Sequence, residues 1–563
     1  MPSARNVDVS HESLLRLYEK ELDAFYRTYP LVQRDRADAV YSVLSAYDSL
    51  VLFDAGILPR ARFSTDFVIH AKYLEDGLTY AIRWLHDGKE VCDLRSSTSR
   101  DLAVESAAFL HFARDYAVVA DLHYMYGRKQ LDVCVEPVSR TVSFQYRHHG
   151  LSPLSGSDDT AHAGLRSLLA SRGDENTSLF REARVAMTNA SWEQLDGRIV
   201  LRDGAVLRDP ALATICSRVD NAQDELIPAA TDLLGFTVEQ FNSVVAILRR
   251  WSFCALFRFI ENVLGGVPQV ECSATQIVER SRFDEFVGEA TGLEPKVIGQ
   301  IIRRLSYDER SPRPDILLQP LVCGPRFVSW SPRVMQSTRA LRNVLRVMLR
   351  TKAQRDYTAT VVGSRERRML VRLGDMFATR GGCQFKVARK MAAGGEKGEM
   401  DLLVYSTREP SQLLLIEGKA VLGADEINEV DAVTKEMQKG QDQLRRCLRV
   451  LDSMSEADKC SLYPFVKWHL VCEVFAVVVT LDSDPNEVYD HSEIPGIALS
   501  TISLRCRDKH FRSPRAFWAA CKERRWQKHL DGLDHGVHPL RIGDVTYHVP
   551  IAFLPESASD DQM

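Results

Sequence analysis

This sequence of 563 residues lacks the patterns that indicate a zinc site, a disulfide framework, a membrane-spanning helix or a cleaved leader segment. It contains 12 cysteines but no C-x-x-C pair and no Cys/His cluster at zinc spacing, so a structural zinc or a disulfide framework is not expected. Its longest apolar runs, such as residues 474–479, fall far short of the ~20 residues that a membrane-spanning helix needs. The N-terminus has no apolar segment followed by a small-residue cleavage site. We therefore expect a cytoplasmic protein with no membrane partner.

Three common catalytic signatures are also absent. The chain has no G-x-x-x-x-G-K-S/T phosphate loop, no G-x-S-x-G nucleophile elbow and no H-E-x-x-H zinc helix. These absences argue against a P-loop ATPase, an α/β-hydrolase and a zinc-helix metalloprotease. If the function needs ATP hydrolysis or targeting, we expect a partner protein to supply it.

Charge is distributed unevenly along the chain. The formal net charge is −4, yet residues 339–400 contain 15 Lys and Arg against 5 Asp and Glu. The corresponding counts are 38 against 45 for residues 1–338 and 19 against 26 for residues 401–563. A basic segment of this kind suits an enzyme that handles a polyanion, because Lys and Arg that neutralise phosphates release counterions. A solvated helix face is the alternative interpretation.

The periodicity of apolar residues separates two units in the first part of the chain. Residues 1–150 mix helical patterns with strand-like runs at 79–85 and 141–147, which predicts an α+β domain of unknown role. A Ser/Gly/Asp-rich stretch near 148–164 marks a boundary. Residues 165–338 are mainly helical and form a candidate domain for recognising a target or a partner.

The last unit, residues 339–555, begins with a basic helix and then alternates helices with strands. Such alternation predicts a three-layer α/β arrangement, so the chain as a whole is expected to be α/β with an N-terminal α+β and helical region. The expected elements are a helix at 364–378, strands at 385–390, 401–405 and 413–420, a long helix at 424–452, strands at 470–480 and 496–505, and a helix at 514–529.

Charged residues with a distinctive spacing lie on two of these strands. Asp401 opens the apolar strand GEMDLLVY, and Glu417 and Lys419 lie near the end of LLLIEGKA. The period-2 alternation of a strand puts Glu417 and Lys419 on one face, where charges are costly to bury unless they are paired or bind a metal. Two carboxylates from adjacent strands form a hard oxygen site that suits Mg²⁺ or Mn²⁺ and phosphate chemistry. A chance D-x15-E-x-K spacing is the alternative.

Three further residues fit such a site. Glu366 lies on the apolar face of the helix before these strands, where a shared metal or an arginine would be its partner. Gly418 permits the close approach of a ligand, and its carbonyl is a candidate metal ligand. Gln441 falls within the apolar stripe of the long helix that follows. We expect it either to position Lys419 or a phosphate, or to bond to loop backbone.

Together these residues resemble the PD-(D/E)XK nuclease superfamily over about residues 360–505. The resemblance is carried by Glu366, by GEMDLLV around Asp401, by LLIEGK ending at Lys419, and by Gln441, which corresponds to a glutamine found in some branches of the family. It implies a restriction-endonuclease-like α/β/α core in the C-terminal part of the chain.

The resemblance also implies a role for each residue. Asp401 and Glu417 would bind the metal, Lys419 would assist the attacking water, and Glu366 would add to the site. Met400 stands where the family name has a proline, a departure that many members of the superfamily share.

The implied activity is metal-dependent hydrolysis of phosphodiester bonds by an endonuclease or an exonuclease. DNA is favoured over RNA, and a restriction, repair or anti-phage defence system is the expected setting. Two alternatives stay open: a nuclease-like scaffold that binds nucleic acid or protein without cleaving, and a ribonuclease. Residues 1–338, which carry more acidic than basic side chains, are expected to recognise a target or partner and to restrain the nuclease. An oligomer is compatible with all three functions.

The expected nucleic-acid contacts are basic residues from the segment 339–400 and from a second basic stretch at 505–528. The second stretch contains nine Lys and Arg against two acids, together with aromatic residues that would stack on bases. A C-terminal helix docked through its aromatics is the alternative. The candidate contacts are Arg346, Arg350, Arg389, Lys390, Arg512, Arg524 and Arg525.

Overall fold

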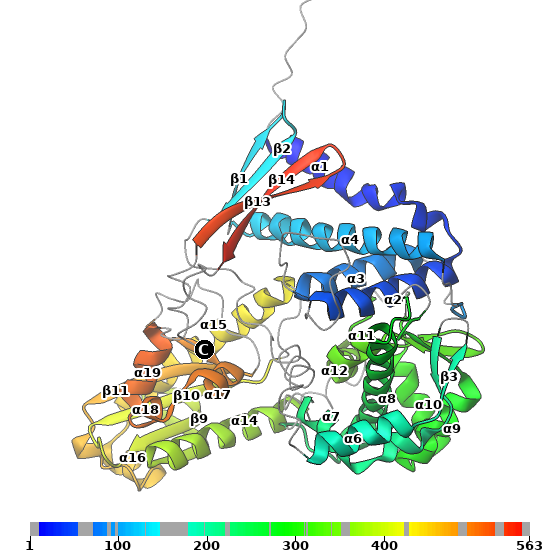
Figure 1. Cartoon of the computed structure of the whole chain (residues 1–563). Coiled ribbons are helices and arrows are strands. Elements are labelled where there is room, and N and C mark those ends of the chain that lie inside the picture. Colours follow the sequence, from blue (N-terminus) through cyan, green and yellow to red (C-terminus); the bar gives the residue numbers. More distant parts are fainter. Residues whose placement is uncertain are drawn as a thin grey trace, which may run out of the picture.

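The computed structural model shows a chain of the α/β class with three regions (Figure 1). The first region contains residues from both ends of the chain, the middle region is mainly helical, and the sheet region contains the candidate site. The structure describes residues 11–54, 71–86, 92–95, 99–129, 131–146, 178–195, 198–219, 226–268, 272–308, 310, 314–338, 340–350, 361–421, 427–481, 493–523 and 534–553.

The first region combines long helices with a four-stranded sheet. The strand expected at 79–85 is wrong, because Leu78, Ala81, Ile82 and Leu85 are buried within a helix. Apolar residues at this spacing line one side of a helix, so the run packs in that form. The elements are α1 His11–Phe25, η1 Tyr26–Thr28, η2 Pro30–Gln33, α2 Arg36–Asp54, α3 Ala71–His86, α4 Arg100–Gly127, β1 Leu131–Glu136 and β2 Thr141–Tyr146, joined by β13 Asp534–Ile542 and β14 Val545–Phe553.

The C-terminal strands β13 and β14 belong to this first region. Residues 546–548 of β14 run parallel to residues 141–143 of β2, and β13 pairs with the other side of β14. Leu540 and Tyr547 are buried in the core of the first region. The expected unit 339–555 is therefore wrong at its C-terminal end, because a lone hairpin is marginal and this one completes the sheet of the first region (Figure 1).

The middle region is built around helix α8. A capping box between Thr237 and Gln240 starts this helix, and its buried Trp251 packs edge-on against Trp330 at 5.2 Å between ring centroids. The elements are α6 Ser178–Asn189, β3 Trp192–Leu195, β4 Arg198–Leu201, η3 Gly204–Arg208, α7 Pro210–Val219, α8 Val238–Leu264, β5 Gln276–Glu279, α9 Arg280–Thr291, α10 Pro295–Leu305, β6 Val322–Cys323, β7 Phe327–Trp330, α11 Pro332–Ser337 and α12 Ala340–Arg350.

Helix α12 also corrects the expected domain boundary. Its buried residues Leu341, Val344 and Met348 join the core cluster of the middle region. The basic helix thus closes the middle region instead of opening the last unit at residue 339. The boundary expected near 148–164 lies outside the described residues.

A buried carboxylate joins the first and middle regions. Oδ1 of Asp48, in α2, accepts hydrogen bonds from the hydroxyl of Ser331 at 2.5 Å and from the backbone N–H of Arg333 at 3.0 Å. Its Oδ2 accepts from the hydroxyl of Thr275 at 2.9 Å. Burial raises the pKa of Asp48 to about 6, although the three hydrogen bonds oppose that shift. Two segments of the middle region are therefore tied to one side chain of the first.

The sheet region is a five-stranded mixed sheet of order β12-β11-β10-β9-β8. Strands β8, β9 and β10 pair antiparallel, and β10, β11 and β12 pair parallel. Only the first three residues of the strand expected at 496–505 are a strand, and the rest form a helix. The elements are α14 Gly363–Met376, η7 Phe377–Gly381, β8 Cys383–Ala393, β9 Glu396–Ser406, β10 Gln412–Lys419, α15 Ile427–Ser453, α16 Glu456–Leu462, η8 Trp468–Leu470, β11 Glu473–Thr480, β12 Gly496–Ala498, α17 Leu499–Arg505, α18 Asp508–Phe511 and α19 Pro514–Glu523.

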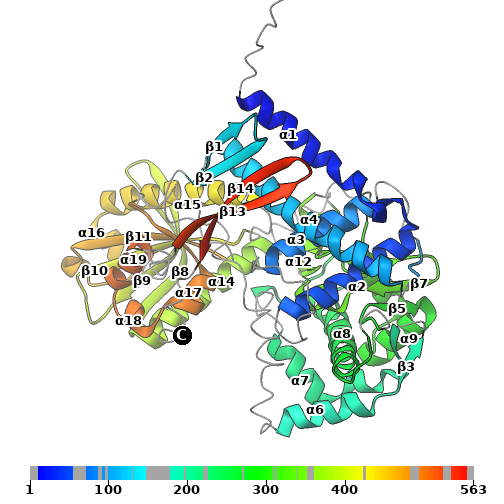
Figure 2. The ribbon, with the colours of Figure 1, turned by 45° about the horizontal axis from the view of Figure 1, so that its top comes forward.

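Helices cover both faces of this sheet, as Figure 2 shows for α15 and α16 on one side and α14, α17 and α18 on the other. Along β10, Leu414 and Ile416 join the core cluster that contains residues of α14, α17 and α19. Leu413 and Leu415 join the cluster that contains residues of α15. The alternation places Glu417 on the α15 side, at the carboxyl end of the strand.

Candidate active site

Strands β9 and β10 separate at the candidate site. Their ladder ends at Leu402 opposite Ile416, so Asp401 and Glu417 stand one residue beyond it. Glu417 remains in the ladder with β11. The side chain of Asp401 then bridges the two strands, because its Oδ2 accepts a hydrogen bond of 2.9 Å from the backbone N–H of Gly418. The carboxylate is held in place by the strand that carries its partner.

The strand on the other side of Asp401 is irregular as well. The ladder between β8 and β9 continues on both sides of Ala388, which lies opposite Asp401 and has a φ of 49°. A left-handed φ at a residue other than glycine is strained, and strain of this kind is concentrated at functional sites. Asp401 therefore stands where the regular pairing is interrupted towards both neighbouring strands.

Two carboxyls and one ammonium meet at this point. Nζ of Lys419 lies 2.6 Å from Oε1 of Glu417, which confirms that the two side chains share one face of β10. Glu417 is only 1% exposed, and among the described residues its Oε2 has no hydrogen-bond partner of acceptable geometry. Burial and the charge of Asp401 raise the pKa of Glu417, and burial also raises the pKa of Asp401. Both groups resist being ionised together.

Glu366 brings a third carboxyl to the site from α14. Burial and the charge of Asp401 raise its pKa to about 7, against the opposing effects of Lys419 and of a hydrogen bond with the backbone of Ala420. Burial disfavours the charge of Lys419, but the surrounding carboxyls outweigh this effect and raise its pKa. Lys419 is therefore a cation near neutral pH, suited to orienting water and stabilising negative charge rather than to accepting a proton.

The donor set fits a hard divalent cation in part. Within the described ranges, no cluster of three or more His, Cys, Asp or Glu side chains is arranged to hold a metal ion. Asp401 and Glu417 remain as two neighbouring carboxylates, which is the number of protein ligands that Mg²⁺ commonly uses. Glu366, expected as a further ligand, adds charge but is not part of a three-ligand cluster. Because the charges of the three carboxyls repel one another, a divalent cation bound by Asp401 and Glu417 would favour their ionised forms.

Two glycines fit the helices against the end of β10. A Cβ on Gly418 would lie 2.9 Å from the Cε of Met369 and 3.0 Å from a methyl of Leu370, so its missing side chain makes room for α14. This close packing, together with the N–H that binds Asp401, gives Gly418 a structural role apart from the expected carbonyl ligand. Gly440 of α15 was missed by the sequence analysis. A Cβ there would lie 2.9 Å from Val478 and 3.4 Å from the Cγ of Glu417.

Gln441 is buried beside this glycine and takes the second of its two expected roles. Its Nε2 donates a hydrogen bond of 2.9 Å to the carbonyl of Ile494, just before β12. The amide thus ties α15 to loop backbone. The glycine one position earlier, an unusual residue inside a long helix, is the sequence signal that α15 approaches the strands of the candidate site closely.

The expected nucleic-acid contacts are scattered. Arg346 lies half-buried on α12 in the middle region. Arg389 and Lys390 are exposed on the edge strand β8, and Arg512 is exposed after α18. The side chains of Arg350, Arg524 and Arg525 lie outside the described residues. No single surface formed by these residues follows from the described positions.

The aromatics of the second basic stretch belong to the core. Phe511 and Phe517 are fully buried, with ring centroids 5.8 Å apart. Trp518 packs against Phe475 at 5.3 Å, and the ammonium of Lys522 lies 4.8 Å from the Trp518 ring centroid. The expectation of base stacking is wrong for the two phenylalanines, because they anchor α18 and α19 to the sheet. Trp526 lies outside the described residues.

Comparison with known proteins does not assign the chain to a family: no protein-family model, curated protein or solved structure matches it. None of the described helices is both long and apolar enough to cross a membrane.

Proposed function

We propose that the sheet region is the catalytic core of a metal-dependent nuclease of the PD-(D/E)XK type. One observation carries this proposal: Asp401, Glu417 and Lys419 meet where β9 and β10 separate, with the Lys419 ammonium bonded to Glu417 and Asp401 bonded to the intervening N–H of Gly418. The order of helix, three antiparallel strands, helix and parallel strand is compatible with the restriction-endonuclease-like core that the motif implies.

The residues divide the work of phosphodiester hydrolysis. Asp401 and Glu417 would hold Mg²⁺ or Mn²⁺, which when bound supplies positive charge and a more acidic water. Lys419 keeps its ammonium beside Glu417, where it can orient a nucleophile or stabilise charge on the phosphate. The N–H of Gly418 fixes Asp401, and Glu366 adds a carboxyl from α14. The strained Ala388 keeps regular pairing away from Asp401.

DNA is the proposed substrate, with RNA as the alternative, and a defence or repair system is the proposed setting. A partner protein would supply any ATPase activity. The second candidate function is a nucleic-acid or protein-binding scaffold without catalysis. The absence of a three-ligand metal cluster among the described residues favours that alternative, and the retained Lys419–Glu417 contact favours the enzyme.

Purified full-length protein should be incubated with Mg²⁺ or Mn²⁺ and with plasmid, linear duplex, single-stranded DNA and RNA. We expect cleavage that EDTA stops and added metal restores. Asp401→Asn and Glu417→Gln should remove it, and Lys419→Met should lower it by about 10²–10⁴-fold, the range typical of a positioned proton-transfer or charge-stabilising group. Glu396→Gln, which changes an exposed acid on β9, is the matched control and should cleave normally.

Each outcome bears on the proposal. Full activity of the Glu417 variant would refute the site assignment. Binding of nucleic acid without cleavage in any metal would favour the scaffold, and cleavage of RNA alone would replace the proposed substrate.

A further inference from the structure

A cavity of about 580 Å³ lies along the outer side of α14, away from the sheet. Its walls come from α14, from η7 and from Pro228 of the middle region. Leu226, close by in the sequence, is buried in the core of the sheet region, so the cavity lies at a junction of two regions. Pockets at such junctions are common ligand sites. We call it the α14 groove.

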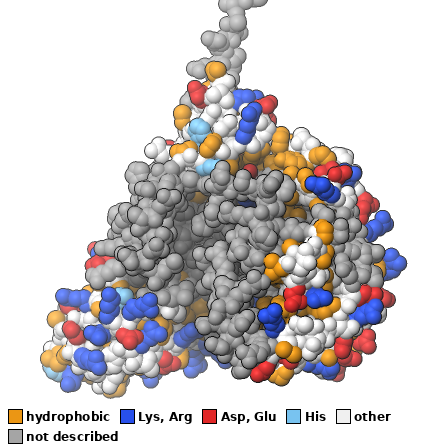
Figure 3. Space-filling view, viewed as in Figure 1, with side chains coloured by type: hydrophobic (Ala, Val, Ile, Leu, Met, Phe, Trp, Pro, Cys, Tyr) orange, Lys and Arg blue, Asp and Glu red, His pale blue; other side chains and the backbone are white. Residues whose placement is uncertain are grey.

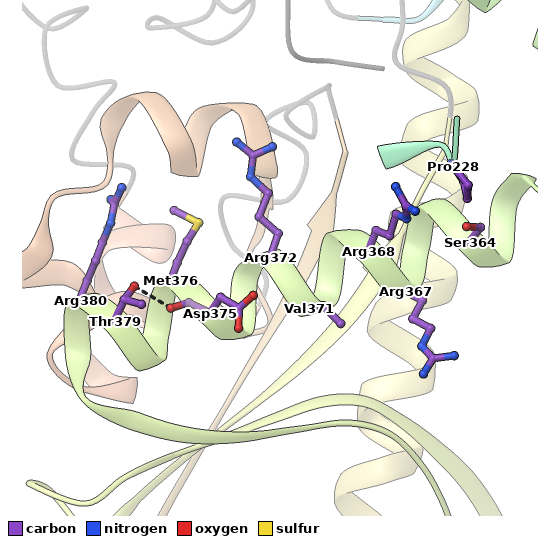
Figure 4. A pocket seen from close by; sticks show the side chains of 10 residues that line it. All are labelled: Pro228, Ser364, Arg367, Arg368, Val371, Arg372, Asp375, Met376, Thr379 and Arg380. Atoms are coloured by element: carbon purple, nitrogen blue, oxygen red, sulfur yellow. Dashed lines mark hydrogen bonds between the residues drawn. The ribbon is translucent and has the colours of Figure 1, made fainter. Parts of the chain in front are cut away.

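Arginines dominate the lining of the α14 groove. Arg367, Arg368, Arg372 and Arg380 are all exposed, against one acidic residue, Asp375. Figure 4 shows Arg368, Arg372 and Arg380 pointing to the same side of the helix. Arg380 also lies 3.8 Å from Asp508, which offsets part of its charge. Figure 3 shows one face of the molecule, and Lys and Arg side chains are spread over the part of that face where α14, α18 and α19 lie.

The shape of this charge favours an extended anion. Residues four apart on a helix are separated by about 6 Å along its axis, so Arg368 and Arg372 form a row and do not converge on one point. Arginine is the preferred partner of phosphate, because its planar guanidinium makes paired hydrogen bonds. The groove has few apolar anchors besides Val371 and Met376, whereas a peptide partner usually fills apolar pockets.

We infer that the α14 groove binds the phosphate backbone of a nucleic-acid strand. This inference rests on the proposed function for the nature of its ligand. The first turn of α14 carries Glu366, whereas Asp401 and Glu417 lie on the α15 face of the sheet. A strand held along the outer side of α14 would therefore be anchored to a helix that contributes to the candidate site, and would reach the site around the end of that helix. A strand bound there would also contact both walls of the junction at once. The groove would therefore position the substrate without taking part in the reaction.

Fluorescence anisotropy on the full-length protein in EDTA tests binding without cleavage. The probes are a labelled single strand of about 30 nucleotides and its duplex, measured over a range of salt concentrations. The test variant is Arg368→Gln with Arg372→Gln. The matched control is Arg445→Gln with Arg449→Gln, which removes two exposed arginines at the same spacing from α15. Both double variants change the net charge equally.

We expect the α14 variant to bind at least about 10-fold more weakly near 100 mM salt. Its plot of log affinity against log salt should be shallower by about 1.4 for the single strand, since two phosphate contacts are lost. The control should change little, and Arg368→Lys with Arg372→Lys should restore the salt slope. Equal losses in test and control, or an unchanged slope in the test variant, would overturn the inference, as would a wild-type protein that binds neither probe.

Failure of the proposed function would give a different result. If the wild type binds through the α14 groove but cleaves nothing with any metal, catalysis is wrong and the groove stands. If the wild type cleaves while the α14 variant binds and cleaves normally, catalysis stands and the groove inference is wrong.

Discussion

Gly440→Ala adds one methyl group to α15 and should disturb the candidate site from the face of the sheet that α15 covers. The new Cβ would lie 2.9 and 3.2 Å from the two methyls of Val478, and 3.4 Å from the Cγ of Glu417. The shorter contacts are closer than side chains tolerate, so α15 and β11 must move apart by a few tenths of an ångström. Val478 pairs with Glu417 across the ladder, and this movement therefore reaches the carboxylate proposed to bind the metal.

Two opposing effects set the change in stability. Replacing glycine by alanine inside a helix stabilises by about 1 kcal/mol, and overpacking a core costs about 1–3 kcal/mol. Gly440→Ala should thus lower local stability by up to about 2 kcal/mol. Gly299→Ala is the control, because Gly299 lies in helix α10 and a Cβ there meets nothing within 4 Å. This control should gain about 1 kcal/mol.

Hydrogen exchange on the full-length protein measures both effects, in the amides of α15 and β10 for one variant and of α10 for the other. Because small displacements of catalytic groups are costly, we also expect kcat of Gly440→Ala to fall by about 10-fold, with Gly299→Ala unchanged. The alternative result is that Gly440→Ala slows amide exchange in α15 as much as Gly299→Ala slows it in α10, with kcat unaltered. That result would refute the argument that α15 packs tightly against the candidate site.

Three further predictions concern other parts of the molecule. Folding raises the pKa of Asp48 from 3.8 to about 6. The stability that the protonated Asp48 contributes is therefore fully present below pH 3.8, the pKa of the unfolded state, and is lost as the pH rises through about 6. Asp48→Asn should remove this pH-dependent loss of about 3 kcal/mol in the free energy of unfolding. If the free energy of unfolding falls with pH equally in the wild type and the variant, this prediction is wrong. Ala388→Gly should stabilise the sheet region by up to about 1 kcal/mol, as measured by exchange of β8 amides, and a lower protection would show that its φ of 49° is unstrained. Deleting residues 534–563 should expose β2 and lower the melting temperature, whereas an unchanged melting curve would mean that the hairpin adds no stability.

Local pattern predicted the elements that carry the site, because long apolar runs and glycine turns mark them clearly. The strands expected at 401–405 and 413–420 correspond to β9 and β10, and the helix at 424–452 corresponds to α15. Period-2 alternation also placed Glu417 and Lys419 on one face, as their contact confirms. The β-branched residues of the segment LSTISLR favour a strand, yet the segment forms helix α17 directly after the three-residue strand β12.

Partners distant in sequence could not be predicted in this way. The amphipathic pattern of α12 shows that one side is buried, but it does not say that the core of the middle region buries it. Likewise the β13–β14 hairpin has a clear strand pattern with no indication that β2 is its neighbour. A chain cut at residue 340 would therefore keep this hairpin without its sheet. A test of whether the N-terminal part restrains cleavage must remove residues 534–563 as well.

The pairing of β2 with β14 also sets an order of events during synthesis. About 400 residues separate the two strands, so at the usual rate of translation the ribosome needs roughly 20–80 s to make the second after the first. Through that interval β2 has an open edge, and open strand edges promote aggregation. The helices and the β1–β2 hairpin of the first region are made before the middle and sheet regions, but the region is completed only after both. A stop codon just before β13 would therefore leave this earlier region unfinished.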